Sequence, residues 1–279
     1  MQPAKYKVST ITATGSLGTE LDLDEMYAAL DAELVGSDPG MYLTYIEYGT
    51  RKTCTIYKGT CRRVEPGRRC RPRARRFDNQ VTLIVSVVTP TFTHVVNSKC
   101  FRNGNVQMTG LRHIDEGVRV IDFIAAKIRG VATPPSICAD PGKLAASAFR
   151  VRLINSDFRI GFNVRREVLN RIVQFEYGVF ATYEPCIYPG VKIQYFWNGA
   201  LDPAARSGRC ACAQMCSGKG TSDKTGFCKK VTISVFQSGC VIVTGAQSYE
   251  QVDDACAFLT RVVHDNEARV RQPDVPVPA

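Results

Sequence analysis

Four cysteines in one glycine-rich segment are the residues of this chain best suited to chemistry. Cys210, Cys212, Cys216 and Cys228 follow the spacing C-x-C-x3-C-x11-C. Four thiolates in a segment too polar to form its own core favour a closed structural Zn²⁺ site. Free thiols are the alternative, because the spacing differs from the common paired CxxC pattern.

A second and looser set of candidate metal ligands lies in the first half of the chain. It consists of Cys54, Cys61 and Cys70, with His94 or Cys100 as a fourth ligand. The chain holds 12 cysteines, and its first ten residues lack the apolar stretch of a secretory signal. Thiols and metal ligands are therefore expected here rather than disulfides, in a protein that is not secreted.

Other residue patterns argue against an enzyme. The three histidines, His94, His113 and His264, are scattered, and no paired carboxylates occur in a motif context. A nuclease or glycosylase-like use of the fold is therefore not expected. No apolar run approaches the length of a bilayer span, so no membrane association is expected.

Positive charge is concentrated in residues 50–80. The net charge of the chain is +10, and this segment holds eleven Arg and Lys against Glu65 and Asp78, which gives 11 − 2 = +9. Clustered arginines suit phosphate geometry, so we predict an arm that contacts DNA phosphates; a solvated loop is the alternative. The expected contacts are Arg62, Arg63, Arg68, Arg69, Arg71, Arg73, Arg75 and Arg76.

A ten-residue pattern, FxxGxVxxTG, occurs twice. It spans residues 101–110 and again residues 236–245. Each copy predicts a strand, a tight turn at the first glycine, a second strand, and a helix beyond the Thr-Gly pair. Because the period is too long for a solenoid, we expect one duplicated unit, whose pseudo-twofold surface would suit duplex DNA.

The predicted elements repeat in the same order in both halves. Repeat 1 is expected over 1–132 with a basic, cysteine-containing insertion at about 50–95, and repeat 2 over 149–264 with a cysteine-rich insertion at about 198–229. A linker at 133–148 joins them, and residues 265–279 are expected to form a disordered tail. Both insertions are expected between the strand after the first helix and the FxxG strand.

Further motifs resemble one family. Residues 180–190, FATYEPCIYPG, look like the second-repeat signature of the TATA-box-binding protein (TBP) family, and Leu21-Asp-Leu23 matches its first repeat. The run at 228–239 and the insertions resemble divergent members from large (giant) DNA viruses. This resemblance implies an α+β saddle with two pseudo-symmetric repeats, one curved antiparallel sheet, helices on the convex face and DNA in its minor groove beneath.

The face left bare by the helices can be predicted from strand alternation. Steps of two residues from Thr109 and Thr244 define it, because successive side chains on a strand alternate between faces. A face rich in Thr, Ser and Asn suits the A·T minor groove. The simpler alternative is that threonine merely favours strands. The other expected residues are Val8, Thr10, Thr12, Lys99, Phe101, Gln107, Leu153, Asn155, Thr232, Ser234, Phe236 and Ile242.

The resemblance also assigns residue roles. The four aromatics that kink DNA in the family map to Tyr42, Phe101, Tyr188 and Phe236, and Glu184 matches a position that contacts a TFIIB-type factor. The expected partners are double-stranded DNA, a TFIIB-like factor and the RNA polymerase machinery, with a monomer on the DNA. The expected place of action is a host nucleus or a cytoplasmic viral factory.

Two functions follow from these features. The first is a transcription initiation factor that binds A·T-rich DNA and nucleates promoter assembly. The second is an architectural protein that bends or packages DNA without recruiting polymerase. A preference for A·T-rich promoter DNA over random DNA would separate them.

Overall fold

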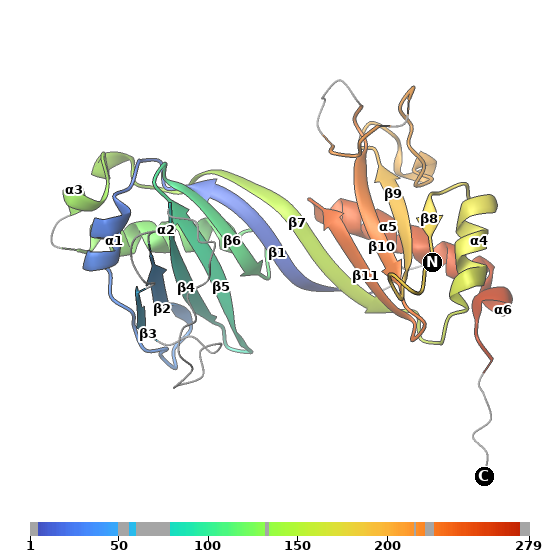
Figure 1. The fold of residues 1–279 in the computed structure, drawn as a ribbon, viewed down its shortest axis with the longest axis horizontal. Helices are drawn as coiled ribbons and strands as arrows, with labels where there is room; N and C mark the ends of the chain where they lie inside the picture. The colour runs from blue at the N-terminus through green and yellow to red at the C-terminus, as the bar shows by residue number, and fades with distance from the viewer. Residues whose placement is uncertain are drawn as a thin grey trace, which may run out of the picture. The chain divides into compact units, whose positions relative to one another are not determined.

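The computed structural model describes residues 5–49, 56–59, 79–131, 134–214, 216–220 and 226–273. It has the expected α+β architecture, in which helices pack on an antiparallel sheet that is not closed into a barrel (Figure 1). The strands are β1 (Lys7–Ser16), β2 (Gly40–Tyr48), β3 (Ile56–Gly59), β4 (Gln80–Val88), β5 (Thr93–Phe101), β6 (Asn105–Leu111), β7 (Ser147–Arg159), β8 (Ala181–Thr182), β9 (Val191–Trp197), β10 (Lys229–Val235) and β11 (Cys240–Ala246). Their hydrogen-bonded order is β3-β2-β4-β5-β6-β1-β7-β11-β10-β9-β8.

The helices vary widely in length. They are α1 (Leu23–Ala29), α2 (Glu116–Arg129), α3 (Pro134–Ile137), α4 (Arg166–Phe175), α5 (Tyr249–Asp265) and α6 (Glu267–Val270), with short 3-10 turns η1 (Pro141–Lys143) and η2 (Pro203–Ala205). Side chains start two of them: the Asp22 carboxylate accepts from Asp24 N and Glu25 N, and the Ser248 hydroxyl accepts from Gln251 N. Both satisfy amide groups that a helix start leaves free.

The chain forms two compact units. Unit 2 comprises residues 10–151, and unit 1 comprises residues 1–9 together with residues 152–279. In unit 2, α2 packs on β6 while α1 packs on β2 and β4. In unit 1, α5 packs on β9, β10 and β11, and α4 packs on β8 and β9. Each unit therefore has a sheet face that carries its helices and an opposite face, called the open face below.

The duplicated motif is confirmed at the level of the backbone. Gly104 and Gly239 form the two turns with φ of 75° and 72°, in the left-handed region that favours glycine. The carbonyl of Gly104 accepts from Leu17 N, and that of Gly239 accepts from Ile160 N, both at 2.8 Å. The two copies thus make the same contact with the chain that leaves the opening strand.

The two inserted segments interrupt different connections, contrary to the sequence-based expectation. In unit 2 the insertion lies in the chain between β3 and β4, and β4 is the strand beside β5. In unit 1 the insertion joins β9 to β10, the two strands that correspond to β4 and β5. Strand β4 and the start of β5 therefore occupy residues that we expected to belong to the first insertion. The prediction failed because β2 and β4 both alternate, and alternation alone does not say which strand pairs with β5.

The end of helix α1 and the C-terminal segment of the chain also differ from expectation. Helix α1 ends at Ala29, although an apolar-periodic pattern that predicts a helix continues in the sequence to Val35. The chain after Asp265 was expected to be disordered, yet α6 follows and Gln272 N donates to Asn163 O. Apolar burial explains the second difference, because Val270 is fully buried. Within the described residues, no helix is long and apolar enough to cross a membrane.

Candidate nucleic-acid interface and metal centre

The open face of unit 2 carries the polar residues predicted for it. Thr12 lies opposite Thr109, Thr109 lies opposite Asn97, and Gln107 lies opposite Lys99. These side chains are half-buried or exposed, whereas the residues between them, such as Ala13 and Met108, are fully buried under the helices. The alternation of faces along β1, β5 and β6 is therefore as predicted, and Phe101 shares the open face at the end of β5.

The Thr10 side chain hydrogen-bonds to the backbone on this face. Its hydroxyl accepts a hydrogen bond from Gly110 N at 3.2 Å, next to a register shift between Ile11 and Thr12. Gly110 has a φ of 101°, and a Cβ there would lie 2.4 Å from Val95 O. The Thr-Gly pair of the motif therefore forms an irregularity near the end of β6, where a side chain in place of Gly110 would clash.

The open face of unit 1 shows the same arrangement. Thr232 lies opposite Thr244, and Ser234 lies opposite Ile242, which lies opposite Asp157. Leu153 and Asn155 are half-buried on β7, and Val8 of β1 is half-buried in the part of that strand that belongs to unit 1. Ser9 Oγ donates to Asn155 O at 3.1 Å.

Sequence reasoning missed several residues of the open faces. Lys192 and Gln194 of β9 lie opposite Ser234 and Thr232, and Asp157 adds a negative charge to the same face. In unit 2 the missed residues include Asn97 and Thr82, which lies opposite Lys99. Two-residue steps along these strands would have found all of them once the strand pairing was known.

The four expected aromatics do not form two equivalent pairs. Tyr188 and Phe236 lie together with ring centroids 5.8 Å apart, and Lys192 Nζ lies 4.2 Å from the Tyr188 ring. In unit 2, however, Phe101 lies opposite Gln80 at the start of β4, while Tyr42 lies opposite Ser86 six residues farther along. Tyr42 and Phe101 therefore do not lie side by side in unit 2.

The strand order explains this result. Strand β4 takes the place in unit 2 that β9 takes in unit 1, and Tyr188 lies three residues before the start of β9. The residue three before β4 is Phe77, which lies outside the described residues. Tyr42 instead donates its hydroxyl hydrogen to Asp38 O at 3.0 Å.

The predicted basic arm falls outside the described residues. This applies to Arg62, Arg63, Arg68, Arg69, Arg71, Arg73, Arg75 and Arg76, as it does to Cys54, Cys61 and Cys70. Lys58 of the same segment is described, and its Nζ donates to Ala28 O, Leu30 O and Asp31 Oδ1. We therefore assign Lys58 to the attachment of β3 rather than to phosphate contact.

The other candidate ligands of the first cysteine set have separate surroundings. His94 Nε2 lies 2.8 Å from Glu116 Oε1, where both side chains are almost fully buried. Burial acts to raise the pKa of Glu116, but the contact with His94 and the hydrogen bond from Arg112 N together hold that pKa below its usual value. Cys100 is fully buried six residues along β5, about 20 Å away. His94 and Cys100 therefore cannot bind the same ion.

Glu184 lies in an exposed turn before β9. Its carbonyl accepts from Ile187 N and Tyr188 N, both at 2.9 Å, and its side chain is exposed. Ile187 and Phe180 are 78% and 48% exposed beside it. This turn therefore offers a carboxylate together with apolar side chains, a combination suited to protein contact.

The four cysteines of the second insertion come together, as predicted. The Sγ atoms of Cys210, Cys212, Cys216 and Cys228 all lie within 4.8 Å of one another and are called the Cys cluster below. Two Sγ–Sγ separations, Cys210 to Cys216 and Cys212 to Cys228, are 3.6 Å. A disulfide requires about 2.05 Å, whereas tetrahedral Zn–S bonds of about 2.3 Å place sulfurs about 3.8 Å apart. The geometry thus fits a metal with four thiolate ligands.

Backbone groups around the Cys cluster also suit thiolates. A hydrogen bond from the Phe227 backbone lowers the pKa of Cys212 to about 7, while burial raises the pKa of Cys228 to about 12. Gly226 has a φ of 121°, and a Cβ there would lie 2.6 Å from Cys212 Sγ. Phe196 packs against the cluster and supplies its apolar side. Such shielding is typical of structural metal sites.

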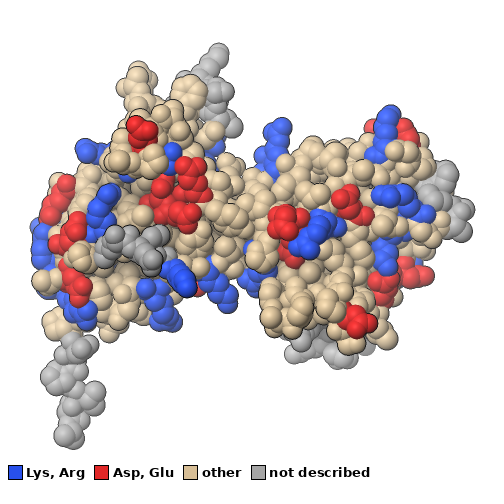
Figure 2. All heavy atoms as spheres, turned by 180° about the vertical axis from the view of Figure 1, so that it is seen from behind, with Lys and Arg blue, Asp and Glu red and all other residues tan. Residues whose placement is uncertain are grey.

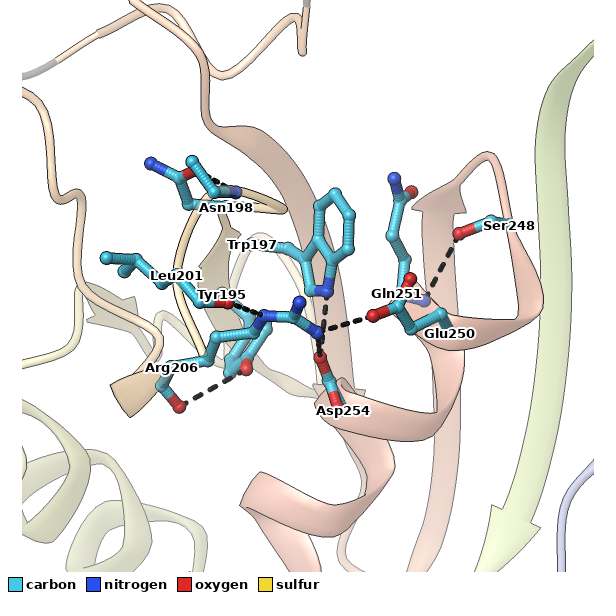
Figure 3. Close-up of polar contacts among 10 residues, drawn as sticks. Tyr195, Trp197, Asn198, Leu201, Arg206, Ser248, Glu250, Gln251 and Asp254 are labelled. Carbon is cyan, nitrogen blue, oxygen red and sulfur yellow. Dashed lines mark hydrogen bonds and ion pairs between the residues drawn. The ribbon is translucent and has the colours of Figure 1, made fainter. Parts of the chain in front are cut away.

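A buried arginine attaches the other part of this insertion to α5 (Figure 3). Arg206 Nη1 donates to Glu250 Oε1 at 2.7 Å and Asp254 Oδ2 at 2.6 Å, and its guanidinium lies 4.8 Å from the Trp197 ring centroid. Trp197 Nε1 donates to the same Asp254 oxygen at 2.8 Å. Sequence reasoning missed this network; the acidic pair spaced by one helical turn was its only signal.

Three comparisons bear on the family. The family model described as "Transcription factor TFIID (or TATA-binding protein, TBP)" matches residues 223–266, which include β10, β11 and α5. A "TATA-box-binding protein-like" protein of Acanthamoeba polyphaga mimivirus is 25% identical over 272 residues, which are 92% of this chain. The chain spans 64% of the length of that relative. A solved structure, "Methanococcus jannaschii TBP", is 16% identical, covers 94% of this chain and 99% of its own, and has a TM-score of 0.48.

Proposed function

We propose that this chain, a divergent TATA-box-binding-protein-like protein, binds the minor groove of A·T-rich DNA through its two open faces and nucleates promoter assembly. The observation that carries the proposal is the duplication. Two copies of one strand–turn–strand unit, β5–β6 and β10–β11, each present threonines on the face opposite the helices. A ligand with two similar halves matches such a surface, and duplex DNA is one.

The chemistry of the open faces supports this ligand. Thr12, Thr109, Thr232 and Thr244 offer hydroxyl donors, while Ile242 and the threonine methyls offer apolar contact. The minor groove of A·T pairs presents acceptors only, without the amino group of guanine. Hydroxyl donors among small apolar groups therefore favour A·T over G·C. The pair Tyr188 and Phe236 is our candidate wedge into a base step, and Phe101 is its counterpart in unit 2.

Recruitment is the second half of the proposal. We place a TFIIB-like factor at the exposed turn around Glu184, with the RNA polymerase machinery following it, and a monomer on the DNA in a nucleus or a viral factory. A protein that only bends or packages DNA is the alternative. A packaging protein would bind random and promoter duplexes equally well. Measuring the affinity for both duplexes therefore separates it from an initiation factor. No catalytic step is part of either function.

Paired substitutions on the two faces test the DNA-binding proposal. Thr109→Glu with Thr244→Glu places one carboxylate on each open face, where it would meet phosphates and groove acceptors. Ala126→Glu with Ala257→Glu adds the same charge to exposed sites on α2 and α5. We expect the threonine pair to lower affinity for an A·T-rich duplex at least 100-fold and the alanine pair less than threefold. Equal effects of the two pairs in a fluorescence-anisotropy titration would reject the open faces as the reading surface.

The basic arm should supply much of the electrostatic affinity. If six of its arginines contact phosphates, deletion of residues 60–78 should flatten the slope of log K against log salt by about 5. Preference for A·T over G·C should survive, because phosphate contacts carry little sequence information. An unchanged slope after the deletion would assign the arm to a protein partner.

The Cys cluster is proposed to hold one structural Zn²⁺. Cys210, Cys212, Cys216 and Cys228 would be its four ligands, with no open coordination position for chemistry. The metal would replace the apolar core that this polar segment lacks.

A further inference from the structure

The two aromatics of the candidate wedge, called the wedge pair below, come from separate segments of unit 1. Tyr188 lies in the exposed turn of residues 183–189, called the Glu184 turn below, and Phe236 lies at the start of the β10–β11 turn. Gly190 lets the rings meet, because a Cβ there would lie 3.0 Å from the Tyr188 ring and 3.2 Å from the Phe236 ring. The wedge pair therefore depends on how the two segments are held together.

The β10–β11 turn is held by backbone contacts to the chain that enters α4. Gln237 O accepts from Val164 N at 2.7 Å, two residues before the start of that helix. Gly239 lies so close to Phe162 that a Cβ on the glycine would collide with the Phe162 carbonyl oxygen. Phe236 is therefore attached to a support that includes the start of α4.

Arg166, the first residue of α4, joins this support to the Glu184 turn. Its Nη2 donates to Gln237 Oε1 at 3.0 Å, and its Nη1 donates to Pro189 O. Its guanidinium carbon lies 5.1 Å from the centroid of the Tyr183 ring. Each of these three partners is adjacent in sequence to a member of the wedge pair or to Glu184. One guanidinium thus contacts both segments that form the wedge pair.

The matching position in unit 2 carries leucine. The backbone bond that joins the chain before α4 to the β10–β11 turn has a counterpart from Leu21 N to Arg102 O at 2.7 Å. Two residues farther along, Leu23 of α1 takes the place of Arg166. Leu23 is fully buried, whereas Arg166 is half-buried. The guanidinium contacts therefore belong to the second repeat, which is the repeat in which two of the expected aromatics lie together.

The positive charge of Arg166 offers a second use, which is contact with DNA phosphates. Its partners are a carbonyl, an amide and a phenol ring, so they leave that charge in place. Elsewhere on unit 1 acidic side chains gather, as the view from behind shows (Figure 2), and α5 carries Glu250, Asp253 and Asp254. A phosphate contact would add to the salt dependence of DNA binding, whereas a positioning role would not.

We propose that Arg166 is a positioning residue, which holds the wedge pair for insertion into DNA and holds the Glu184 turn for a protein partner through the same guanidinium. The inference rests on the proposed function. It adds that DNA bending and the order of the partner surface depend on one side chain. Both should therefore be lost together when that side chain is replaced.

Substitutions on α4 test this role against a matched control. Arg166→Leu introduces the residue found at the matching position of unit 2, and Arg171→Leu replaces an exposed arginine of the same helix. In the free protein we expect Arg166→Leu to accelerate amide hydrogen exchange over residues 183–189 at least fivefold. On an A·T-rich duplex we expect it to reduce the bending measured by FRET to the level of Phe236→Ala. Arg171→Leu should match the wild-type protein in both measurements.

A second variant separates geometry from charge. Arg166→Lys keeps the positive charge but loses the planar fork of donors, so it should behave like Arg166→Leu in exchange and bending. Wild-type exchange and bending in either variant would overturn the positioning role. If Arg166→Leu flattens the slope of log K against log salt by about 1 and leaves exchange unchanged, the arginine contacts phosphate instead.

The outcomes also separate the inference from the function on which it rests. Wild-type protein that fails to bend A·T-rich DNA would overturn the proposed function, while faster exchange in free Arg166→Leu would still establish the positioning. Should that variant fold poorly, Gln237→Ala is informative, because it removes one partner of the guanidinium at an exposed position. Exchange over residues 183–189 should then rise at least twofold, and unchanged exchange would contradict the inference.

Discussion

The connections β4–β5 and β9–β10 occupy the same place in the two repeats and are built in opposite ways. In unit 2, Thr89–Phe92 closes the connection, and one hydroxyl secures it: Thr89 Oγ1 donates to Phe92 O at 2.7 Å and accepts from Phe92 N at 3.1 Å. In unit 1 the connection runs from Asn198 to Cys228 and depends on Arg206 and four thiols. A short turn satisfies its own polar groups locally, whereas a long polar connection has too little apolar surface and requires ionic or metal contacts.

Of the variants below, loss of one thiol should destabilise the longer connection, β9–β10, most strongly. In Cys216→Ser we expect bound zinc to fall from one equivalent to none and hydrogen exchange to accelerate over residues 198–228, because structural zinc contributes about 10 kcal/mol or more to small sites. Elemental analysis and exchange mass spectrometry measure both. Cys186→Ser is the control, since Cys186 is exposed outside the cluster. Wild-type protein without zinc and with four freely titratable thiols would exclude the metal.

The same site predicts a pH dependence. Zinc binds thiolates, and burial holds the pKa of Cys228 at about 12 before metal binds. Zinc must therefore displace a proton there, and its apparent affinity should fall as pH is lowered, with release of zinc in acid. A chelator competition series at several pH values measures this trend.

Removal of the arginine anchor should have an intermediate effect. Arg206 is 6% exposed, but Glu250 and Asp254 are 56% and 22% exposed. Loss of one partner of a fully buried pair costs about 3–5 kcal/mol; water can reach these two acids, so we expect Arg206→Ala to cost about 2 kcal/mol. Arg269→Ala breaks the exposed pair with Glu176 and should cost below about 1 kcal/mol. Urea unfolding compares them, and equal losses would contradict the anchoring role.

The smallest change in the free energy of unfolding is expected for substitutions in the short β4–β5 turn. Thr89→Ala removes both hydroxyl contacts and should lower the free energy of unfolding by about 1 kcal/mol. Thr91→Ala, whose hydroxyl lies 3.5 Å from that of Thr89, should change it by less than about half as much. If the two variants unfold at the same urea concentration, the turn is held by its backbone alone.

The sequence predicted local features of this molecule better than distant ones. The period of two along β1, β6 and β11 identified which threonines share a face, because alternation is a property of each strand by itself. The motif also located both turns, since Gly104 and Gly239 adopt a backbone conformation that other residues resist. The cysteine spacing led to the Cys cluster because four thiols in one short segment have few alternative partners.

Tertiary pairing explains what was missed. Tyr42 was predicted as one of four DNA-kinking aromatics, but β4 rather than β2 is the neighbour of β5, and only the hydrogen bonds of these strands distinguish them. Arg206 could not be connected with Glu250 and Asp254, which lie more than forty residues away in sequence. Helix α6 was missed because its short segment is stabilised by contacts with α4 rather than by its own pattern.

The division of the chain at residues 9–10 and 151–152 has a consequence for genetic dissection of this protein. The residues up to Ser9 belong to the unit formed by the second repeat, where Ser9 Oγ of β1 donates to Asn155 O and Tyr6, just before β1, hydrogen-bonds to Asp253. The first residues of β7 belong to the other unit, where Ser147 Oγ donates to Ser16 O. A gene divided in the 133–148 segment would therefore yield two fragments, each lacking strand residues that the other fragment carries. Such halves should be recovered by co-expression as a complementing pair rather than as independent domains.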